Sequence, residues 1–330
     1  MANILLTQKC VRSCPYCFAK DNMESAEANA VMSWQNMLYL ADMLEASKEN
    51  HVSLLGGEPT IHPHFIDYVL YLLHRSFHVT VFTSGVISPR LLAEMEKHLS
   101  KVHSERLSFV CNLNHPDISP ADELNKTKKF LTAFAPFITP GFNIYRPDFD
   151  LTFIFDYIQQ YGLRRHVRLG LTHPIQPAAE NAYLHLADMR KMASRLMEFS
   201  DSFLKLQTTP GFDCGFPVCI FTDEQIGVLY KAGKGRLSFR CGPAIDIGPD
   251  MTVWPCFPLH EFEKKSVFDF STVGEIGKYY SDLMAKTRAG GRSGIFEECN
   301  DCEHLQGLCS AGCLAYVLMN KAALSGAQSV

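Results

Sequence analysis

Three cysteines stand close together near the start of this chain, at Cys10, Cys14 and Cys17. Their C-x3-C-x2-C spacing follows directly on an apolar run at 4–7, which predicts a strand. Three thiolates on one short loop can hold three corners of a cubane iron–sulfur cluster and leave the fourth iron without a nearby protein ligand. The fold must therefore present this loop at a strand end, with one metal position open to a further ligand. A structural zinc site needs four ligands, and this loop supplies three.

The composition limits where such a site can work. The 330 residues suffice for one large α/β barrel-type domain or for two domains. A net charge of −4 shows no basic surplus, so we expect no nucleic-acid partner. No apolar run approaches the roughly 18 residues of a membrane span, and the N-terminus lacks the features of a secretory signal. We therefore expect no membrane association and a reducing cytoplasm, where the 12 cysteines indicate metal ligands rather than disulfides.

Short apolar runs alternate with helical patterns over the first part of the chain. The predicted strands are 4–7, 51–55, 78–83, 106–113, 137–145 and 166–171. The predicted helices are 33–46, 63–74, 88–99, 120–134, 149–161 and 182–199. Six βα units in sequence predict a parallel sheet with helices outside, closed into a partial (β/α)6 barrel rather than a complete eight-unit one.

Polar and glycine-rich segments follow four of these predicted strands. They are the cysteine loop 10–17, Gly56–Glu58, 83–85 and 112–114. Chemistry in parallel βα folds sits at the carboxyl ends of the strands, so these segments converge on one rim. Each alone has an ordinary explanation, such as a tight turn with a solvated glutamate at Glu58, and their agreement carries more weight than any one of them.

The character of the sequence changes near residue 208, where Gly, Pro and Cys become more frequent. The turn-forming residues at 208–211 suggest a boundary between a domain at 1–207 and a second at 208–330. Residues 241–256 predict a hairpin with a cysteine at each end and a turn at 248–250. The second part holds eight further cysteines: Cys214, Cys219, Cys241, Cys256, Cys299, Cys302, Cys309 and Cys313.

The cysteine loop, with the aromatic Tyr16 before its last cysteine, and the Gly-Gly-Glu-Pro segment resemble the signature of the radical S-adenosylmethionine (SAM) enzymes. The resemblance implies that the loop holds a [4Fe–4S] cluster whose open iron is chelated by the amino and carboxylate groups of SAM. It also implies that Gly56, Gly57 and Glu58 contact the SAM amino group. Ser84 stands where many members have asparagine.

The same resemblance implies that Asn112 and Asn114 face the ribose and carboxylate of SAM, and that Arg168 is a further candidate for cofactor binding. Ordinary polar strand ends are the alternative for each. Cys111 directly precedes Asn112. We interpret it as a small buried apolar residue, with hydrogen-atom donation to a substrate radical as the catalytic alternative.

The C-terminal cysteines resemble the SPASM or twitch extension, which binds auxiliary [4Fe–4S] clusters in many radical SAM maturases. This chain departs from the full pattern, because the second gap of its last run has six residues and no cysteine follows Cys313. Cys214 and Cys219 are candidates to replace the missing ligand. One or two auxiliary clusters are thus expected, with zinc as the alternative.

The resemblance also suggests two sets of ligands. One would combine Cys241, Cys256 and Cys313 with either Cys214 or Cys219. The other would combine the remaining one of that pair with three cysteines of the last run: Cys299, Cys302 and Cys309.

The function implied is reductive cleavage of SAM to a 5′-deoxyadenosyl radical, which abstracts a hydrogen atom from a substrate. We expect a ribosomally made peptide or protein as substrate, with a small metabolite such as a sugar or nucleotide as the alternative. An electron donor such as flavodoxin or ferredoxin is implied. The first strand begins near residue 4 and leaves no room for a preceding leader-binding domain, so a separate leader-binding protein is a candidate partner. The remote alternative is a non-enzymatic zinc or electron-transfer protein.

Overall fold

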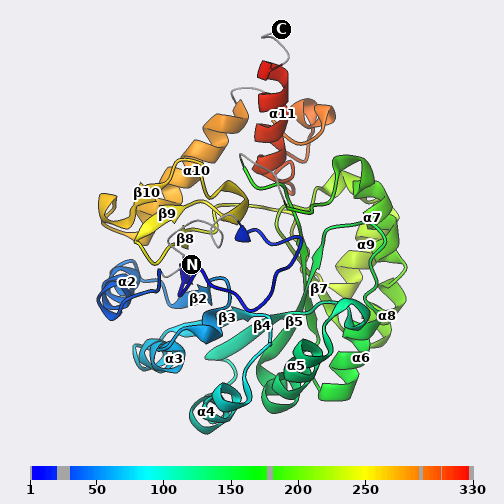
Figure 1. The fold of residues 1–330 in the computed structure, drawn as a ribbon. Coiled ribbons are helices and arrows are strands. Elements are labelled where there is room, and N and C mark those ends of the chain that lie inside the picture. The colour runs from blue at the N-terminus through cyan, green and yellow to red at the C-terminus, as the bar shows by residue number, and fades with distance from the viewer. Residues whose placement is uncertain (1, 21–29, 177–180, 290–292, 306, 327–330) are drawn as a thin grey trace.

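The computed structural model describes residues 2–20, 30–176, 181–289, 293–305 and 307–326. Its centre is a run of seven parallel strands, each paired with its predecessor in the chain. Together they form an open arc rather than a closed barrel (Figure 1). The strands are β1 (Ala2–Leu5), β2 (His51–Leu55), β3 (His78–Thr83), β4 (Leu107–Asn112), β5 (Ile138–Ile144), β6 (His166–Leu171) and β7 (Thr209–Asp213).

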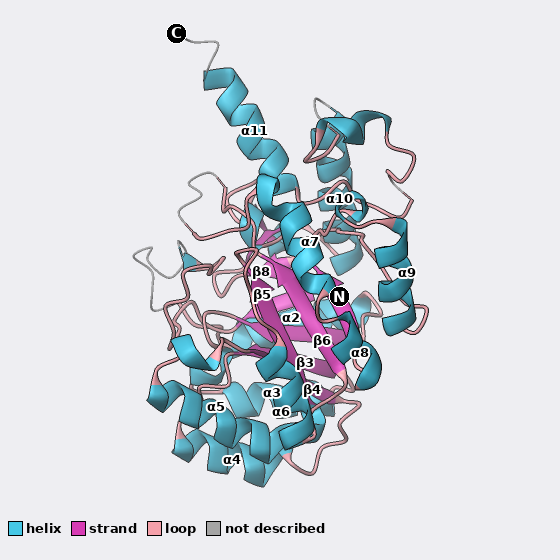
Figure 2. Ribbon diagram, turned by 90° about the vertical axis from the view of Figure 1, so that its right-hand side faces the viewer, coloured by secondary structure: helices cyan, strands magenta, loops and turns pink. Residues whose placement is uncertain are grey.

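Helices cover the outer side of this arc (Figure 1). They are α2 (Trp34–Ala46), α3 (Phe65–His74), α4 (Pro89–Leu99), α5 (Ala121–Phe134), α6 (Thr152–Tyr161), α7 (Met189–Met197) and α8 (Ser200–Lys205). Figure 2 shows α3 to α6 packed along the same side of the sheet. The α/β partial barrel predicted from the alternating pattern is confirmed.

The helices begin where the sequence supplies caps. The Ser33 side chain accepts a hydrogen bond from the backbone N–H of Asn36 and starts α2. Ser88 caps α4 in the same way, and Pro89 occupies the first turn, where a missing N–H costs nothing. Gly162 ends α6 in the left-handed conformation, with φ of 71°. These local signals explain why the helix positions could be read from the sequence.

Successive side chains along each strand point alternately toward the helices, where they form the core, and toward the interior of the barrel. In β4, Leu107, Phe109 and Cys111 are fully buried, whereas the residues between them are partly exposed. Phe109 packs on Phe130 and Phe134 of α5, with ring centroids 5.3 and 5.5 Å apart. The fully buried side chains of β4 therefore face the helices, and Asn112 is on the opposite face, toward the space that the arc encloses.

Two predicted elements differ from the structure. We placed a boundary at 208–211, but Thr209–Asp213 forms the seventh parallel strand and pairs with β6. Pro and Gly indicate a turn in isolation, yet β7 is the edge strand, where a missing backbone N–H is tolerated. The helix predicted at 182–199 is also shorter: α7 begins at Met189, and α8 follows it.

The C-terminal part continues the same sheet. The predicted hairpin is present as β8 (Asp246–Ile247) and β9 (Thr252–Trp254), which pair antiparallel around the turn at 248–250. β8 also pairs parallel with β1, and β10 (Lys265–Ser266) pairs with β9, so the sheet has ten strands. The division at residues 207 and 208 remains a prediction, and the sheet is continuous across it.

Three further helices complete the described chain: α9 (Asp223–Ala232), α10 (Val273–Ala289) and α11 (Leu314–Gly326). Figure 1 shows α10 and α11 beside the open side of the arc. No helix in the described part of the chain is both long enough and apolar enough to cross a membrane.

Candidate active site

The Gly-Gly-Glu segment packs directly against the backbone that leads into the cysteine loop. The backbone N–H of Gly57 donates to the Thr7 carbonyl at 2.8 Å, and that of Glu58 donates to the Lys9 carbonyl at 2.7 Å. A Cβ atom would lie 2.3 Å from the Thr7 carbonyl oxygen at Gly56, and 2.2 Å from the Lys9 oxygen at Gly57. The glycines thus allow two segments of the chain's own backbone to meet. Contact with SAM remains a prediction for both.

Glu58 joins the ends of β2 and β3. Its carboxylate is only 1% exposed, so the alternative of a solvated glutamate is wrong. One oxygen accepts from the hydroxyls of Thr60 and Thr83 at 2.8 and 2.7 Å. The other accepts from the backbone N–H and hydroxyl of Ser84 at 2.8 and 2.5 Å. The structure thereby brings together two residues that the sequence assigned to cofactor binding.

Cys10, Cys14 and Cys17 are partly buried on the loop after β1. The loop turns tightly at its end, where the Cys17 backbone N–H donates to the Cys14 carbonyl at 3.1 Å. Burial raises the pKa of Cys10 to about 11, so a thiolate there at neutral pH requires a positive partner. A metal supplies that charge, and this donor set fits an iron–sulfur cluster.

Tyr16 attaches the loop to the ends of β4 and β5. Its hydroxyl donates to Asn114 Oδ1 at 2.5 Å, and its ring stacks on Tyr145 with centroids 5.0 Å apart. Asn114 Nδ2 also lies 4.0 Å from the Cys14 sulfur. Asn114 is therefore beside the cysteine loop, and its amide oxygen accepts a hydrogen bond from the protein itself. Its contact with SAM remains a prediction.

Arg168 reaches across the interior from β6 to three strands. Its guanidinium donates to Asn143 Oδ1 at 3.0 Å, to Asn112 Oδ1 at 3.4 Å and to Asp213 Oδ2 at 2.8 Å. Burial raises the pKa of Asp213, but the charge and hydrogen bonds of Arg168, together with hydrogen bonds from Cys214, lower it further, so the pKa of Asp213 lies below its ordinary value. The arginine also points at the Cys214 sulfur, 3.8 Å away. A role in SAM binding stays a prediction for Arg168 and Asn112.

Sequence reasoning missed Asn143, Tyr145 and Asp213. Asn143 and Tyr145 lie at the end of β5, and a strand-end search over 137–145 would have found both. Asp213 was hidden because we did not predict β7.

Cys111 faces the helical layer instead of the interior. It is 0% exposed, and a Cβ on Gly85 would lie 2.9 Å from its sulfur and 3.2 Å from Phe130 of α5. Burial raises its pKa to about 12. This position favours the packing interpretation over hydrogen-atom donation.

A cavity of about 280 Å³ opens beside Tyr16 at the ends of β4 and β5. Its lining includes Asn114, His115, Asn143, Tyr145, Arg146 and Asp150. A second cavity of about 280 Å³ shares Tyr145 and Arg146 with it and extends to residues 181–185. The rim therefore carries both the cysteine loop and enough space for part of a small molecule.

Four of the C-terminal cysteines are neighbours. Burial raises the pKa of Cys214 well above its usual value, and the sulfurs of Cys241 and Cys313 add to the rise. The pKa of Cys256 is also raised well above its usual value, by burial and by the same two sulfurs. In addition, a Cβ on Gly215 would lie 3.1 Å from the backbone nitrogen of Cys313. Cys214 is thereby placed with the hairpin cysteines.

The other four form a second group. Burial raises the pKa of Cys219 to about 11, and Cys299 and Cys309 add to it. The pKa of Cys299 is raised by burial, and the sulfurs of Cys309 and Cys302 add to the rise. Cys219 lies in a short 3-10 helix, Val218–Ile220. The ring of the next residue, Phe221, lies 5.7 Å from the ring of Phe239. The backbone of Phe239 in turn forms an isolated β-bridge with Cys309.

Among the described residues, no three Cys, His, Asp or Glu side chains are close enough to share one metal ion. In a [4Fe–4S] cluster, four irons and their sulfides stand between the thiolates, so its ligands are farther apart than those of a single ion. The observed grouping is compatible with clusters, whose presence remains a prediction.

Comparison with known proteins finds a family match over part of the chain. Residues 4–104 match the model of the Radical SAM superfamily. Human molybdenum cofactor biosynthesis protein 1 is 30% identical over 96 residues, which make up 28% of this chain and 15% of that protein. The chain thus aligns with a small part of that relative.

Solved structures resemble almost the whole chain. Streptococcus suis SuiB bound to S-adenosylmethionine has a TM-score of 0.65 at 14% identity, over 96% of this chain and 73% of that one. SuiB bound to the precursor peptide SuiA has a TM-score of 0.64 at 14% identity, over 96% and 72%. Native anSMEcpe with bound AdoMet has a TM-score of 0.61 at 14% identity, over 99% and 97%. At this identity the similarity shows the fold alone.

Proposed function

We propose that this chain, whose residues 4–104 match the Radical SAM superfamily model, cleaves SAM reductively and uses the resulting radical to modify a peptide or protein. The observation that carries the proposal is the meeting of the cysteine loop with Gly56–Glu58 and Ser84 at one rim. Residues from the ends of β1, β2 and β3, far apart in sequence, converge there as a single site.

In this proposal Cys10, Cys14 and Cys17 hold a [4Fe–4S] cluster. When bound, the cluster supplies the electron that splits SAM into methionine and a 5′-deoxyadenosyl radical. The chain's own residues bind and orient SAM and the substrate. Glu58 fixes the ends of β2 and β3, and Tyr16 holds the loop against Asn114.

The eight later cysteines are proposed to hold two auxiliary [4Fe–4S] clusters. The first set is Cys214, Cys241, Cys256 and Cys313, and the second is Cys219, Cys299, Cys302 and Cys309. The proximity of the cysteines within each group supports this division, with Cys214 in the first set and Cys219 in the second. Iron and acid-labile sulfide should total about four each per cluster. Zinc in place of iron in the anaerobically purified protein would contradict it.

The cleavage step is tested with anaerobically reconstituted protein, dithionite and SAM. The release of 5′-deoxyadenosine is measured by chromatography. Changing Cys10, Cys14 and Cys17 together to alanine should abolish release and leave the auxiliary iron in place. The matched control is Cys111→Ala, because this cysteine packs between β4 and α5. Equal release by the triple variant and the wild type would show that the site is wrongly assigned.

A peptide substrate is favoured by the fold similarity to SuiB, whose structure is known with its precursor peptide. The alternative, a small-molecule substrate, is favoured by the local similarity to a molybdenum cofactor biosynthesis protein. Mass spectrometry of peptides encoded beside the gene, after incubation with SAM and reductant, distinguishes them. A mass change with matching 5′-deoxyadenosine supports the peptide. Turnover of a sugar or nucleotide with all peptides unchanged supports the alternative.

The proposed reaction needs a low-potential electron donor such as flavodoxin or ferredoxin and takes place in the cytoplasm. A separate leader-binding protein would bring the peptide to the rim. Co-purification of a tagged chain with the candidate peptide, with and without such a protein, tests this partner.

A further inference from the structure

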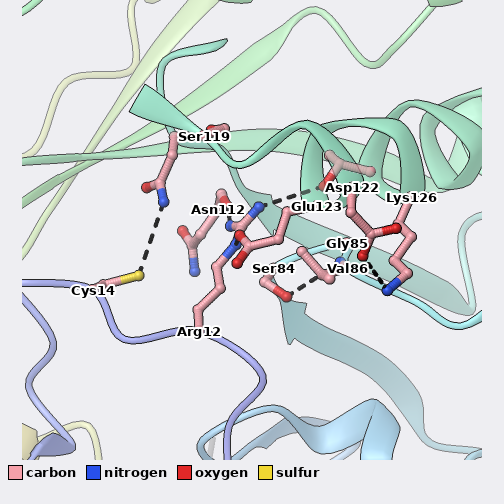
Figure 3. A network of polar contacts seen from close by, with 12 residues as sticks. Arg12, Cys14, Ser84, Gly85, Val86, Asn112, Ser119, Asp122, Glu123 and Lys126 are labelled. Atoms are coloured by element: carbon pink, nitrogen blue, oxygen red, sulfur yellow. Dashed lines mark hydrogen bonds and ion pairs between the residues drawn. The ribbon is translucent and has the colours of Figure 1, made fainter. Parts of the chain in front are cut away.

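Arg12, between the first two cysteines of the loop, is tied to two other elements of the barrel. Its side chain is only 6% exposed. Nε donates to Glu123 Oε2 at 2.9 Å, Nη1 to the backbone carbonyl of Asn112 at 3.1 Å and Nη2 to Thr127 Oγ1 at 3.4 Å. All three guanidinium nitrogens are therefore used, on the end of β4 and on α5. Figure 3 shows Arg12 extending from the loop toward Asn112 and Glu123.

The backbone of the same residue faces a proposed cluster ligand. The Arg12 N–H points at the Cys10 sulfur, 3.4 Å away. One residue thus connects a ligand sulfur, through its main chain, to the fixed barrel wall, through its side chain. A lysine cannot replace this attachment, since a single ammonium lacks the planar fork that reaches separate acceptors at once.

We infer that Arg12 is the positioning residue of the cysteine loop, and that Glu123 fixes it. The inference rests on the proposed function and deepens it: the side chain of Arg12 sets the loop in register with the end of β4, at Asn112 and shortly before Asn114. Without this attachment the loop keeps its cysteines, but their placement relative to the SAM site changes. The role is geometric, and it differs from a purely electrostatic one, in which only the charges near the cluster matter.

The experiment compares Arg12→Lys, Glu123→Ala and Glu123→Gln in the complete, anaerobically reconstituted chain. Lysine keeps the charge and loses the three-way attachment. Alanine removes the acceptor on α5, whereas glutamine removes the charge and keeps an acceptor oxygen. Arg75→Lys is the control, because Arg75 also pairs with two carboxylates, Asp42 and Glu45, but at the opposite end of the strands. The readout is the change that added SAM causes in the electron paramagnetic resonance spectrum, which reports only the cluster with an open iron.

Arg12→Lys and Glu123→Ala should each weaken SAM binding in this titration by about tenfold, because hydrogen bonds of the attachment are lost. Glu123→Gln and Arg75→Lys should stay within about twofold of the wild type, and all variants should keep the auxiliary iron. Wild-type affinity in both Arg12→Lys and Glu123→Ala overturns the inference. So does a loss in Glu123→Gln equal to that in Glu123→Ala, which would indicate charge alone. If the wild type itself shows no SAM-dependent change, the proposed function fails as well, so the two failures are distinguishable.

Discussion

Replacing Gly57 by alanine should dislodge the cysteine loop. The new Cβ would lie 2.2 Å from the Lys9 carbonyl oxygen and 2.7 Å from that of Gln8, closer than atoms can approach. The backbones must separate, which breaks the hydrogen bonds from Gly57 to Thr7 and from Glu58 to Lys9. Two backbone hydrogen bonds at roughly 0.5–1.5 kcal/mol each, with overpacking of about 1–3 kcal/mol, give a loss of about 2–6 kcal/mol.

The loss is measured as the shift of the thermal unfolding midpoint of Gly57→Ala, together with iron per chain and 5′-deoxyadenosine release. We expect a lower midpoint, loss of the iron held by the loop and no detectable cleavage of SAM. The matched control is Gly227→Ala in α9, where a new Cβ meets nothing within 4 Å. That change should stabilise the chain by about 0.5–1 kcal/mol, because alanine favours a helix interior. A Gly57→Ala protein with the midpoint and iron of the wild type would refute the close-approach argument.

Three other predictions concern separate parts of the molecule. Burial raises the pKa of Asp246 from its ordinary 3.8 to about 7, so the folded state keeps a proton that the unfolded chain releases, and stability falls as pH rises between these values. Asp246→Asn should abolish this fall of about 4 kcal/mol. The unfolding midpoint of the variant should then rise relative to that of the wild type as the pH increases from 5 to 8. A difference between the two midpoints that does not change with pH would contradict the prediction. Cys219→Ser should lower iron and sulfide in the auxiliary set, whereas Cys111→Ser should not, and equal metal content in both would refute the assignment of Cys219. Tyr16→Phe removes the hydrogen bond to Asn114 and should weaken SAM binding by about two- to tenfold without loss of iron, and unchanged binding would show that the hydroxyl is dispensable.

The local motifs were readable because their chemistry is encoded in short spacings. The interval between Cys10, Cys14 and Cys17 and the alternation of apolar strands with capped helices depend on neighbouring residues. The resemblance to the Radical SAM superfamily, whose model matches residues 4–104, and the partial barrel could therefore be predicted. The hairpin at 241–256 was found for the same reason, since its turn residues lie between its strands.

Other features depend on contacts between distant residues, and the sequence alone did not determine them. The strand at Thr209–Asp213 forms despite its proline because it lies at the edge of a sheet. Cys214 and Cys219 are only five positions apart, yet they lie in different groups. Gly215, next to Cys214, approaches the backbone of Gly312 and Cys313, whereas the ring of Phe221, two residues after Cys219, lies beside the ring of Phe239.

The cysteine loop itself shows the same division. Its spacing predicts that three thiols serve one site, because ligand type and separation in sequence are local properties of the chain. Only the tertiary structure decided what holds them there: the Gly57 backbone on one side, and Arg12 buried against β4 and α5 on the other. Arg12 and Glu123 are 111 positions apart, so no local sequence pattern could predict their ion pair. It exists because the barrel brings the start of α5 beneath the loop.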